Sequence, residues 1–271
     1  MNIINFLKMH GLGNDFIIVN NDQVDHIKNI THFIQSASDR RLGIGCDQFI
    51  IYKLKLPNFC EMIIYNSDGT IAEACGNGTR CLAALIYEKH SIDRLEIQTQ
   101  TRVIKSFISG QNVSVNMGQV SFEEPWMPSR KDLFDLLNLF DISIKEIQCV
   151  DIGNPHLVIF AKNFNDSDRK ILIEKIYSSH LFKDGVNISF AKIENDIIDL
   201  YVWERGVGYS FACGTAACAS FAAANKLGFI KDEISIKFEL GSLKLHYENN
   251  EIIMTGSATK TISGDYYYES K

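Results

Sequence analysis

The sequence repeats itself at an offset of about 140 residues, and this repeat constrains the fold more than any other feature. The segment ACGNGTRCLAALIYEKHSI begins at Ala74, and the segment ACGTAACASFAAANKLGFI begins at Ala212. Each places Ala-Cys-Gly before an apolar, alanine-rich stretch of helical length, which then runs into alternating apolar and polar residues. Similarity at a fixed period is the signature of a structural unit that occurs twice.

Other landmarks keep the same order at nearly the same offset: Gly13-Asn14 with Gly153-Asn154, Gly45 with Gly185, and Cys75 with Cys213. Gly-Asn turns and Cys-Gly pairs are common, so chance explains any one match but explains the ordered set poorly. The chain is therefore predicted to consist of two homologous domains joined near residues 118–128. Residues 1–118 would hold Cys75. Residues 119–271 would hold Cys213, and their extreme C-terminus could pack back on the N-terminal domain.

Each half combines short strands with one long helix, which predicts an α/β fold of the α+β type. The helices are expected over residues 77–89 and 215–226, and both are apolar over much of their circumference. A helix of that kind is buried, so each is predicted to lie inside its own sheet. Strands are expected over residues 47–54, 61–65, 94–99, 186–192 and 197–203.

Composition excludes several classes of function. Hydrophobic residues make up 46% of the 271 residues, so the chain can bury a sizeable core. The net charge of −6 disfavours nucleic acid or an anionic membrane as partner, because both attract clustered Lys and Arg. No apolar run approaches the roughly 20 residues that span a bilayer, and no signal peptide is recognisable. Seven cysteines without an export signal suggest a reducing cytoplasm rather than a disulfide framework.

Each half places a cysteine, Cys75 or Cys213, directly before its predicted helix. A helix start carries partial positive charge, which lowers the pKa of a thiol and can also hold a carboxylate. Gly76, Gly78 and Gly214 leave the backbone open to such an anion. A lone cysteine in this position is more often structural, so the signal lies in the pair.

Two thiols that border one central cleft could approach a substrate from opposite sides. Inverting a stereocentre needs a base on one face and an acid on the other, and a thiol can serve in both roles. No Lys motif for pyridoxal phosphate is recognisable, and the cysteine spacings do not match a zinc site, so neither a cofactor nor a metal is expected. Cys81 and Cys218, which follow at helical spacing, are assigned to the core.

At this point five motifs resemble the diaminopimelate epimerase family: KMHGLGNDF from Lys8, GIGCDQ from Gly43, NSDGTIAEACGNGTRC from Asn66, GNPH from Gly153, and WERGVGYSFACGT from Trp203. They occur in the family's order and cover most of the chain. The resemblance implies two pseudo-symmetric domains, each a mixed or antiparallel sheet or barrel wrapped around a central helix. It further implies a homodimer that interconverts LL- and meso-diaminopimelate on the lysine and cell-wall route without cofactor or metal.

By this resemblance Cys75 and Cys213 are the catalytic acid and base, and His156 and Glu204 tune the pKa values of the thiols. The resemblance assigns substrate contacts to Asn14, Gln48, Asn66, Gly76, Asn77, Asn154, Asn187, Glu204, Arg205, Gly214 and Thr215. Arg205 is the candidate for the substrate's far carboxylate.

Each assignment has a structural alternative. Asn14 and Asn154 could cap turns, Glu204-Arg205 could be a solvated charge pair, and His156 could be a satisfied core histidine. The chain also departs from the family where Ala216, Ser210 and Cys46 stand, and Cys46 is expected to be a packing residue.

Three other functions remain open from the residues alone. A proline racemase-like or phenazine-biosynthesis-like isomerase would share the fold, although the latter lacks the cysteine pair. A binding protein would need no pair of thiols. A redox protein would join the thiols in a reversible disulfide.

Overall fold

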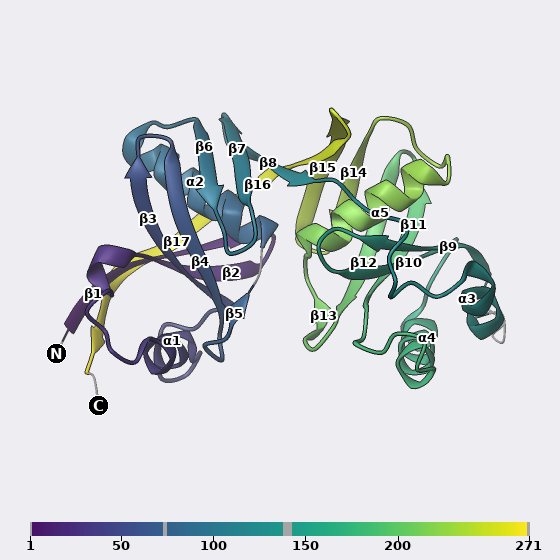
Figure 1. Cartoon of the computed structure of the whole chain (residues 1–271), viewed down its shortest axis with the longest axis horizontal. Coiled ribbons are helices and arrows are strands. Elements are labelled where there is room, and N and C mark those ends of the chain that lie inside the picture. The colour runs from purple at the N-terminus through teal and green to yellow at the C-terminus, as the bar shows by residue number, and fades with distance from the viewer. Residues whose placement is uncertain (1, 73–74, 138–142, 270–271) are drawn as a thin grey trace. The chain divides into compact units, whose positions relative to one another are not determined.

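The computed structural model describes residues 2–72, 75–137 and 143–269, which fall into two compact units (Figure 1). Unit 1 comprises Met1–Asn116 and Thr255–Lys271, and unit 2 comprises Met117–Met254. Ala74, which opens the first repeat segment, lies outside the described residues.

Unit 1 is a mixed sheet combined with one long helix. Its elements are β1 (Asn2–Gly11), β2 (Asn14–Asn20), η1 (Asn21–Gln23), α1 (Ile30–Ser38), β3 (Gln48–Leu56), β4 (Phe59–Asn66), β5 (Ile71–Ala72), α2 (Gly76–His90), β6 (Arg94–Gln98), β7 (Val103–Ser109), β8 (Asn112–Gly118) and β17 (Thr259–Tyr268). The strands pair in the order β17-β1-β2-β3-β4-β6-β7-β8, with β5 also on β4.

Unit 2 repeats this plan. Its elements are α3 (Arg130–Leu137), β9 (Ile144–Asp151), β10 (Pro155–Ala161), α4 (Asp166–Ser178), β11 (Asn187–Glu194), β12 (Ile197–Glu204), β13 (Gly208–Ser210), α5 (Gly214–Lys226), β14 (Glu233–Phe238) and β15 (Gly241–Glu248), and the chain leaves through β16 (Glu251–Ser257). The strands pair in the order β9-β10-β11-β12-β14-β15, with β13 also on β12.

The two units share their directions of pairing as well as their order. In both, the second and third strands of the unit are parallel, the third and fourth are antiparallel, and the strand after the long helix is parallel to the fourth. The predicted duplication of an α/β plan is therefore confirmed.

Each long helix lies inside the curve of its own sheet. Helix α2 contacts β1, β2 and β7, and helix α5 contacts β9, β10, β11, β14 and β15, so strands from both ends of each sheet reach the helix. Every residue of α5 from Ala216 to Ala224 is buried. Such all-round burial explains why these helices lack a polar face.

In the part of the chain that the structure describes, no helix is long and apolar enough to cross a membrane.

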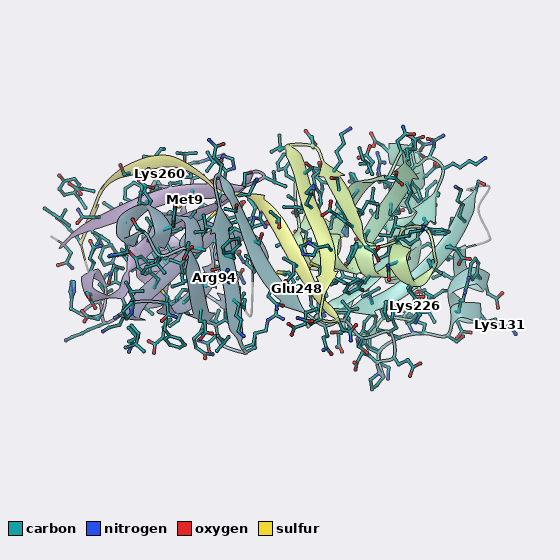
Figure 2. All side chains as sticks on the ribbon, turned by 90° about the horizontal axis from the view of Figure 1, so that it is seen from above. Met9, Arg94, Lys131, Lys226, Glu248 and Lys260 are labelled. Atoms are coloured by element: carbon teal, nitrogen blue, oxygen red, sulfur yellow. The ribbon has the colours of Figure 1, made fainter. Side chains whose placement is uncertain are left out.

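The predicted helices are α2 and α5, and the predicted strands are β3, β4, β6, β11 and β12, with ends that differ by one or two residues. The C-terminal strand β17 falls within residues 119–271, which were assigned to the second domain with the allowance that their extreme C-terminus packs back on the first. It belongs to unit 1, where it pairs antiparallel with β1, and Met9 lies opposite Lys260 (Figure 2). Such a pairing between opposite ends of the chain leaves no local signal in the sequence.

The loop between α1 and β3 is folded tightly against the end of α1. The backbone N–H groups of Ile44 and Gly45 both donate to the carbonyl of Ala37, at 2.9 and 3.0 Å. A Cβ atom on Gly43 would lie only 2.1 Å from the carbonyl oxygen of Ser36, which is backbone and cannot move aside cheaply. Glycine is therefore required where this loop turns toward β3.

We expect Gly43→Ala to lower the free energy of unfolding by about 3 kcal/mol, because the added methyl group forces the loop off α1. Gly264→Ala is the matched control, since a Cβ there would lie 3.4 Å from the Phe6 ring, an ordinary contact. Urea unfolding followed by circular dichroism measures both, and an equal loss for the two variants would contradict the argument.

Candidate functional site

The predicted site residues of unit 1 lie at the ends of three strands and at the start of one helix. Asn14 begins β2, Gln48 begins β3 and Asn66 ends β4. Because β2 and β3 are parallel and β3 and β4 are antiparallel, these ends lie at one edge of the sheet, where Gln48 is opposite Asn66. Cys75 is the N-cap of α2, with an extended backbone.

The Cys75 thiol is joined to two amide side chains. Its Sγ donates to Oδ1 of Asn14 at 3.6 Å, and Nδ2 of Asn77 donates to the same oxygen at 3.3 Å. Asn77 is almost fully buried, whereas Cys75 is half-buried. The Asn14 amide oxygen therefore links the thiol to the first turn of α2.

Gln48 and Asn66 form a second amide pair at the same edge. Nε2 of Gln48 donates to Oδ1 of Asn66 at 3.1 Å, and Nδ2 of Asn66 donates to the Thr70 hydroxyl at 3.0 Å. Both amides are half-buried. Asp68 belongs to the turn after β4, since its carboxylate accepts from the backbone N–H of Thr70 at 2.9 Å.

A charged network, which no sequence motif predicts, lies behind Asn14. The Asp15 carboxylate accepts from both terminal nitrogens of Arg40, at 3.0 and 2.8 Å, and from Lys8 at 3.0 Å. Burial alone would raise the pKa of Asp15, but the hydrogen bonds from Arg40 and Lys8 lower it to about 2. Arg40 also binds Asp47, which in turn accepts from Asn14. The only sequence signal was the run of Asp-Gln after GIGC.

Unit 2 places its residues at the corresponding edge. Asn187 begins β11, Glu204 ends β12, and Cys213 is the N-cap of α5. The Cys213 Sγ donates to Oε2 of Glu204 at 3.3 Å and lies 3.3 Å from the Thr215 hydroxyl. Glu204 thus contacts the thiol that it was predicted to influence.

Burial outweighs the lowering of the Cys213 pKa that was expected from the helix start. Burial raises the pKa of the Cys213 thiol well above its ordinary value, and the Glu204 carboxylate raises it further. The Thr215 hydroxyl and the backbone N–H of Ala216 act in the expected downward direction, but they are the weaker causes. Only 7% of Cys213 is exposed. The prediction of a thiolate favoured by the helix is therefore wrong for this thiol, because removal from water disfavours the charged form more strongly.

His156 is fully buried and neutral. Its Nε2 lies 3.0 Å from Oδ1 of Asn154, and its Nδ1 has no hydrogen-bond partner. Burial, assisted by the charge of Arg205, lowers the pKa of His156 to about 3. His156 pairs with Asn187 as Phe16 pairs with Gln48 in unit 1, so the histidine occupies the position of an aromatic core residue. Its side-chain hydrogen bond joins it to Asn154 and does not reach Cys213.

Asn187 and Arg205 form a separate group in unit 2. Oδ1 of Asn187 accepts from the backbone N–H of Arg205 at 2.9 Å, and the Arg205 guanidinium donates to the carbonyl of Asp184 at 2.9 Å. Gly185 has a φ of +72°, and a Cβ there would lie 3.0 Å from Cδ of Arg205. Arg205 itself is exposed. The arginine side chain therefore lies over a glycine that leaves it room.

The remaining cysteines match their assignment to the core. Cys81 and Cys218 are fully buried in α2 and α5, and Cys46 is 2% exposed. Burial raises the pKa of Cys81 to about 12 and that of Cys46 to about 11. These thiols are poor nucleophiles, because reactivity needs the thiolate.

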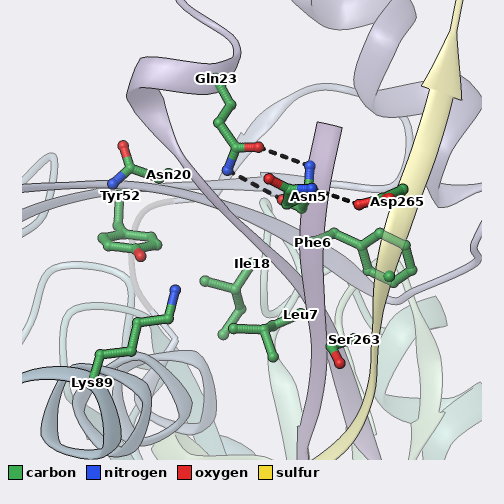
Figure 3. Close-up of a pocket in the computed structure, with 11 residues that line it drawn as sticks. Asn5, Phe6, Leu7, Ile18, Asn20, Gln23, Tyr52, Lys89, Ser263 and Asp265 are labelled. Atoms are coloured by element: carbon green, nitrogen blue, oxygen red, sulfur yellow. Dashed lines mark hydrogen bonds between the residues drawn. The ribbon is translucent and has the colours of Figure 1, made fainter. Parts of the chain in front are cut away.

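A surface pocket of about 500 Å³ in unit 1 lies away from these residues (Figure 3). Gln23 exchanges hydrogen bonds with the Asn5 backbone at its edge, and the Asn5 amide donates to Asp265. None of the predicted site residues lines it.

Comparisons with known proteins agree with these motifs. The family model described as Diaminopimelate epimerase matches residues 6–123 and 148–261. A diaminopimelate epimerase of Rickettsia felis is 48% identical over 267 residues, and one of Rickettsia akari is 49% identical over 267 residues. In both cases the alignment covers 98% of this chain and 98% of the relative.

Two solved structures share the fold. A phenazine biosynthesis protein of the PhzF family from Bacillus anthracis aligns with a TM-score of 0.73 at 15% identity, over 99% of this chain and all of that chain. A hydroxyproline epimerase from Agrobacterium vitis aligns with a TM-score of 0.64 at 13% identity, over 98% of this chain and 91% of that chain. At these identities the likeness concerns the fold alone.

The buried neutral His156 should make folding stability depend on pH. Its pKa is about 3 in the folded chain and near 6.5 when exposed, so between these values only the unfolded chain binds the proton. Stability should therefore fall as the pH falls from 6.5 toward 3, by up to about 1.4 kcal/mol per pH unit. We expect His156→Phe, which copies the Phe16 position, to remove this slope. Urea unfolding from pH 7 to pH 4 tests it, and an unchanged slope in the variant would refute it.

Proposed function

The chain belongs to the diaminopimelate epimerase family, and from this premise we propose that it interconverts LL- and meso-2,6-diaminopimelate with Cys75 and Cys213 as acid and base. Near full-length similarity to the family sets aside the proline racemase-like and phenazine-type alternatives. The binding-protein and redox alternatives differ from the proposal in one testable respect, which is whether the thiols move a proton.

One observation carries the proposal most directly. Each unit has a cysteine at the start of its enclosed helix, and each thiol contacts an oxygen acceptor from the neighbouring strand ends: Asn14 for Cys75 and Glu204 for Cys213. The packing thiol of Cys46 also contacts an oxygen, that of Ser38, so the support comes from the repetition of the contact at both helix starts. The duplicated arrangement supports two proton-transfer groups, as inversion of a stereocentre requires.

In the proposed reaction, one thiolate removes the α-proton from one face of the substrate and the opposite thiol delivers its own proton to the other face. The carbon inverts, and the two sulfur atoms exchange protonation states. The charge that builds up at the α-carbon spreads into the adjoining carboxylate. We assign that carboxylate to the backbone N–H groups of Gly76, Asn77, Gly214 and Thr215, because helix starts stabilise negative charge.

The contacts around the thiols suggest unequal starting states. Burial and the Glu204 carboxylate keep the proton on Cys213, so Cys213 begins as the acid in the proposed cycle. Cys75 contacts a neutral amide instead of a carboxylate. Cys75 is therefore assigned the role of the base that begins the cycle, and in the reverse reaction the roles exchange. The low pKa of His156 means that it acts as a neutral group beside Asn154.

The remaining assignments are proposals of the same kind. Arg205 would bind the far carboxylate, with Glu204 placed near the far ammonium. Substrate contacts are assigned to Asn14, Gln48, Asn66, Asn154 and Asn187. We also propose that the enzyme works without cofactor or metal, as a homodimer in the cytoplasm, in the formation of lysine and peptidoglycan precursors.

We expect Cys75→Ala and Cys213→Ala each to reduce epimerisation at least about 10³-fold, because inversion needs a group on both faces. The assay incubates LL-diaminopimelate in deuterium oxide without added cofactor and measures meso product that carries solvent deuterium at one α-carbon. Cys218→Ala, a buried position in α5, is the control and should retain activity. Near wild-type epimerisation by either single variant would refute the two-thiol mechanism.

We expect Arg205→Lys to lower kcat/KM for diaminopimelate at least about tenfold, because an ammonium keeps the charge but loses the planar fork that holds two carboxylate oxygens. Lysine, which lacks the far carboxylate, should be a very poor substrate of the wild type. Arg94→Lys, at an arginine that stacks on Phe107, controls for the substitution itself. Full activity of the Arg205→Lys variant would return Arg205 to a structural role.

A further inference from the structure

Asn14 is held by a carboxylate on the side opposite the thiol. Its Nδ2 donates to Oδ2 of Asp47 at 3.2 Å, and the same Asp47 oxygen accepts the backbone N–H of Asp15 at 3.0 Å. An ionised carboxylate can only accept hydrogen bonds. The NH₂ group of Asn14 must therefore face Asp47, and its oxygen must face the Cys75 thiol.

Asp47 is itself fixed by its neighbours. Its other oxygen accepts from Arg40 at 2.6 Å, and Arg40 is anchored by its two hydrogen bonds to Asp15. A Cβ on Gly45 would lie 2.8 Å from Cα of Arg40, so glycine at this position, with a φ of +81°, allows the loop to bring Arg40 up to Asp47. Both oxygens of Asp47 are thus engaged by donors.

The second unit has no such carboxylate at the equivalent position. Gln48 corresponds to Asn187, because each pairs with the second strand of its unit in the same register, so Asp47 corresponds to the apolar Val186. There the Asn154 oxygen meets His156 instead of a thiol. The Cys213 thiol finds its acceptor directly in Glu204.

We propose that Asp47 is a positioning residue for the reaction, which holds the Asn14 amide so that its oxygen stays on the Cys75 thiol. This inference rests on the proposed function, in which Cys75 moves a proton. A freed Asn14 amide could rotate and present its NH₂ group to the sulfur. A donor there favours the thiolate, whereas the carbonyl oxygen favours the thiol. Asp47 thereby preserves the strength of Cys75 as the base, because a thiolate that accepts a hydrogen bond from an amide takes up a proton less readily.

The test compares Asp47→Ala and Asp47→Asn with Glu61→Gln. The Asp47 side chain is 44% exposed, so its loss should not prevent folding. Glu61→Gln removes a carboxylate of similar exposure, 47%, that pairs with Lys55 elsewhere in unit 1, so it controls for the loss of a paired surface charge. Iodoacetamide labelling of Cys75 is followed against pH by peptide mass spectrometry in a Cys213→Ala background, with kcat measured in the parent chain.

We expect both Asp47 variants to move the pH midpoint of Cys75 labelling downward by about 0.5–1 unit and to lower kcat about threefold, because the Cys75 thiolate becomes a weaker base. In Asp47→Asn the effect should be the smaller, because its amide can still offer one oxygen. Glu61→Gln should leave the labelling midpoint unchanged, because its ion pair with Lys55 has no part in holding Asn14. Unchanged labelling in both Asp47 variants would overturn the proposal.

A double-mutant cycle shows whether Asp47 acts through Asn14. If it does, Asp47→Ala should have little further effect on Cys75 labelling once Asn14→Ala is present, because the two changes share one path. Equal effects in both backgrounds would overturn the inference. Labelling needs no substrate, so this arm stands even if the wild type incorporates no deuterium, a result that would instead refute the proposed function.

Discussion

A helix without a polar face is stable in water only where other elements cover it on every side. In unit 2 the small side chains of α5 allow strands to approach closely, and the sheet curves until β9 and β15 both contact the helix. Once the helix is enclosed, its start has a fixed place relative to the strand ends. The position of Cys213 beside Glu204 follows from this enclosure, and in unit 1 the same constraint places Cys75 beside Asn14.

Duplication of this plan gives two sites of the same shape with different chemistry. Where unit 1 has the apolar Phe16, unit 2 has His156, and burial there favours the neutral form of its imidazole. Where β4 ends in the amide of Asn66, β12 ends in the carboxylate of Glu204. A symmetric pair of thiols would be identical in protonation behaviour, whereas a carboxylate beside one of them makes the pair unequal. Equal geometry with unequal electrostatics suits a reaction that needs one acid and one base.

The sequence predicted the features that have a local signal. Periodicity located α2, α5 and five strands, and the repeated Ala-Cys-Gly located both thiols. It could not predict the register of β17 on β1, which joins opposite ends of the chain, or the network in which Arg40 binds Asp47 and also Asp15, which lies 25 residues away in sequence. It also gave the wrong direction for the pKa of Cys213, because a helix start is visible in a sequence and the extent of burial is not.

The repeated glycines show how a sequence landmark can carry a physical role that spacing alone does not reveal. Gly45 and Gly185 both have positive φ, and in both a Cβ would press on an arginine side chain, that of Arg40 or Arg205. Arg40 binds the carboxylates of Asp15 and Asp47 behind Asn14, whereas Arg205 binds the Asp184 carbonyl, and both arginines are exposed. In each unit the glycine thus leaves room for an arginine side chain, while the groups that the arginine binds differ. The same positive-φ glycine beside an arginine therefore serves two different roles. In unit 1 the arginine supports the residues that hold Asn14 on the Cys75 thiol. In unit 2, in the proposed function, it recognises the far end of the substrate.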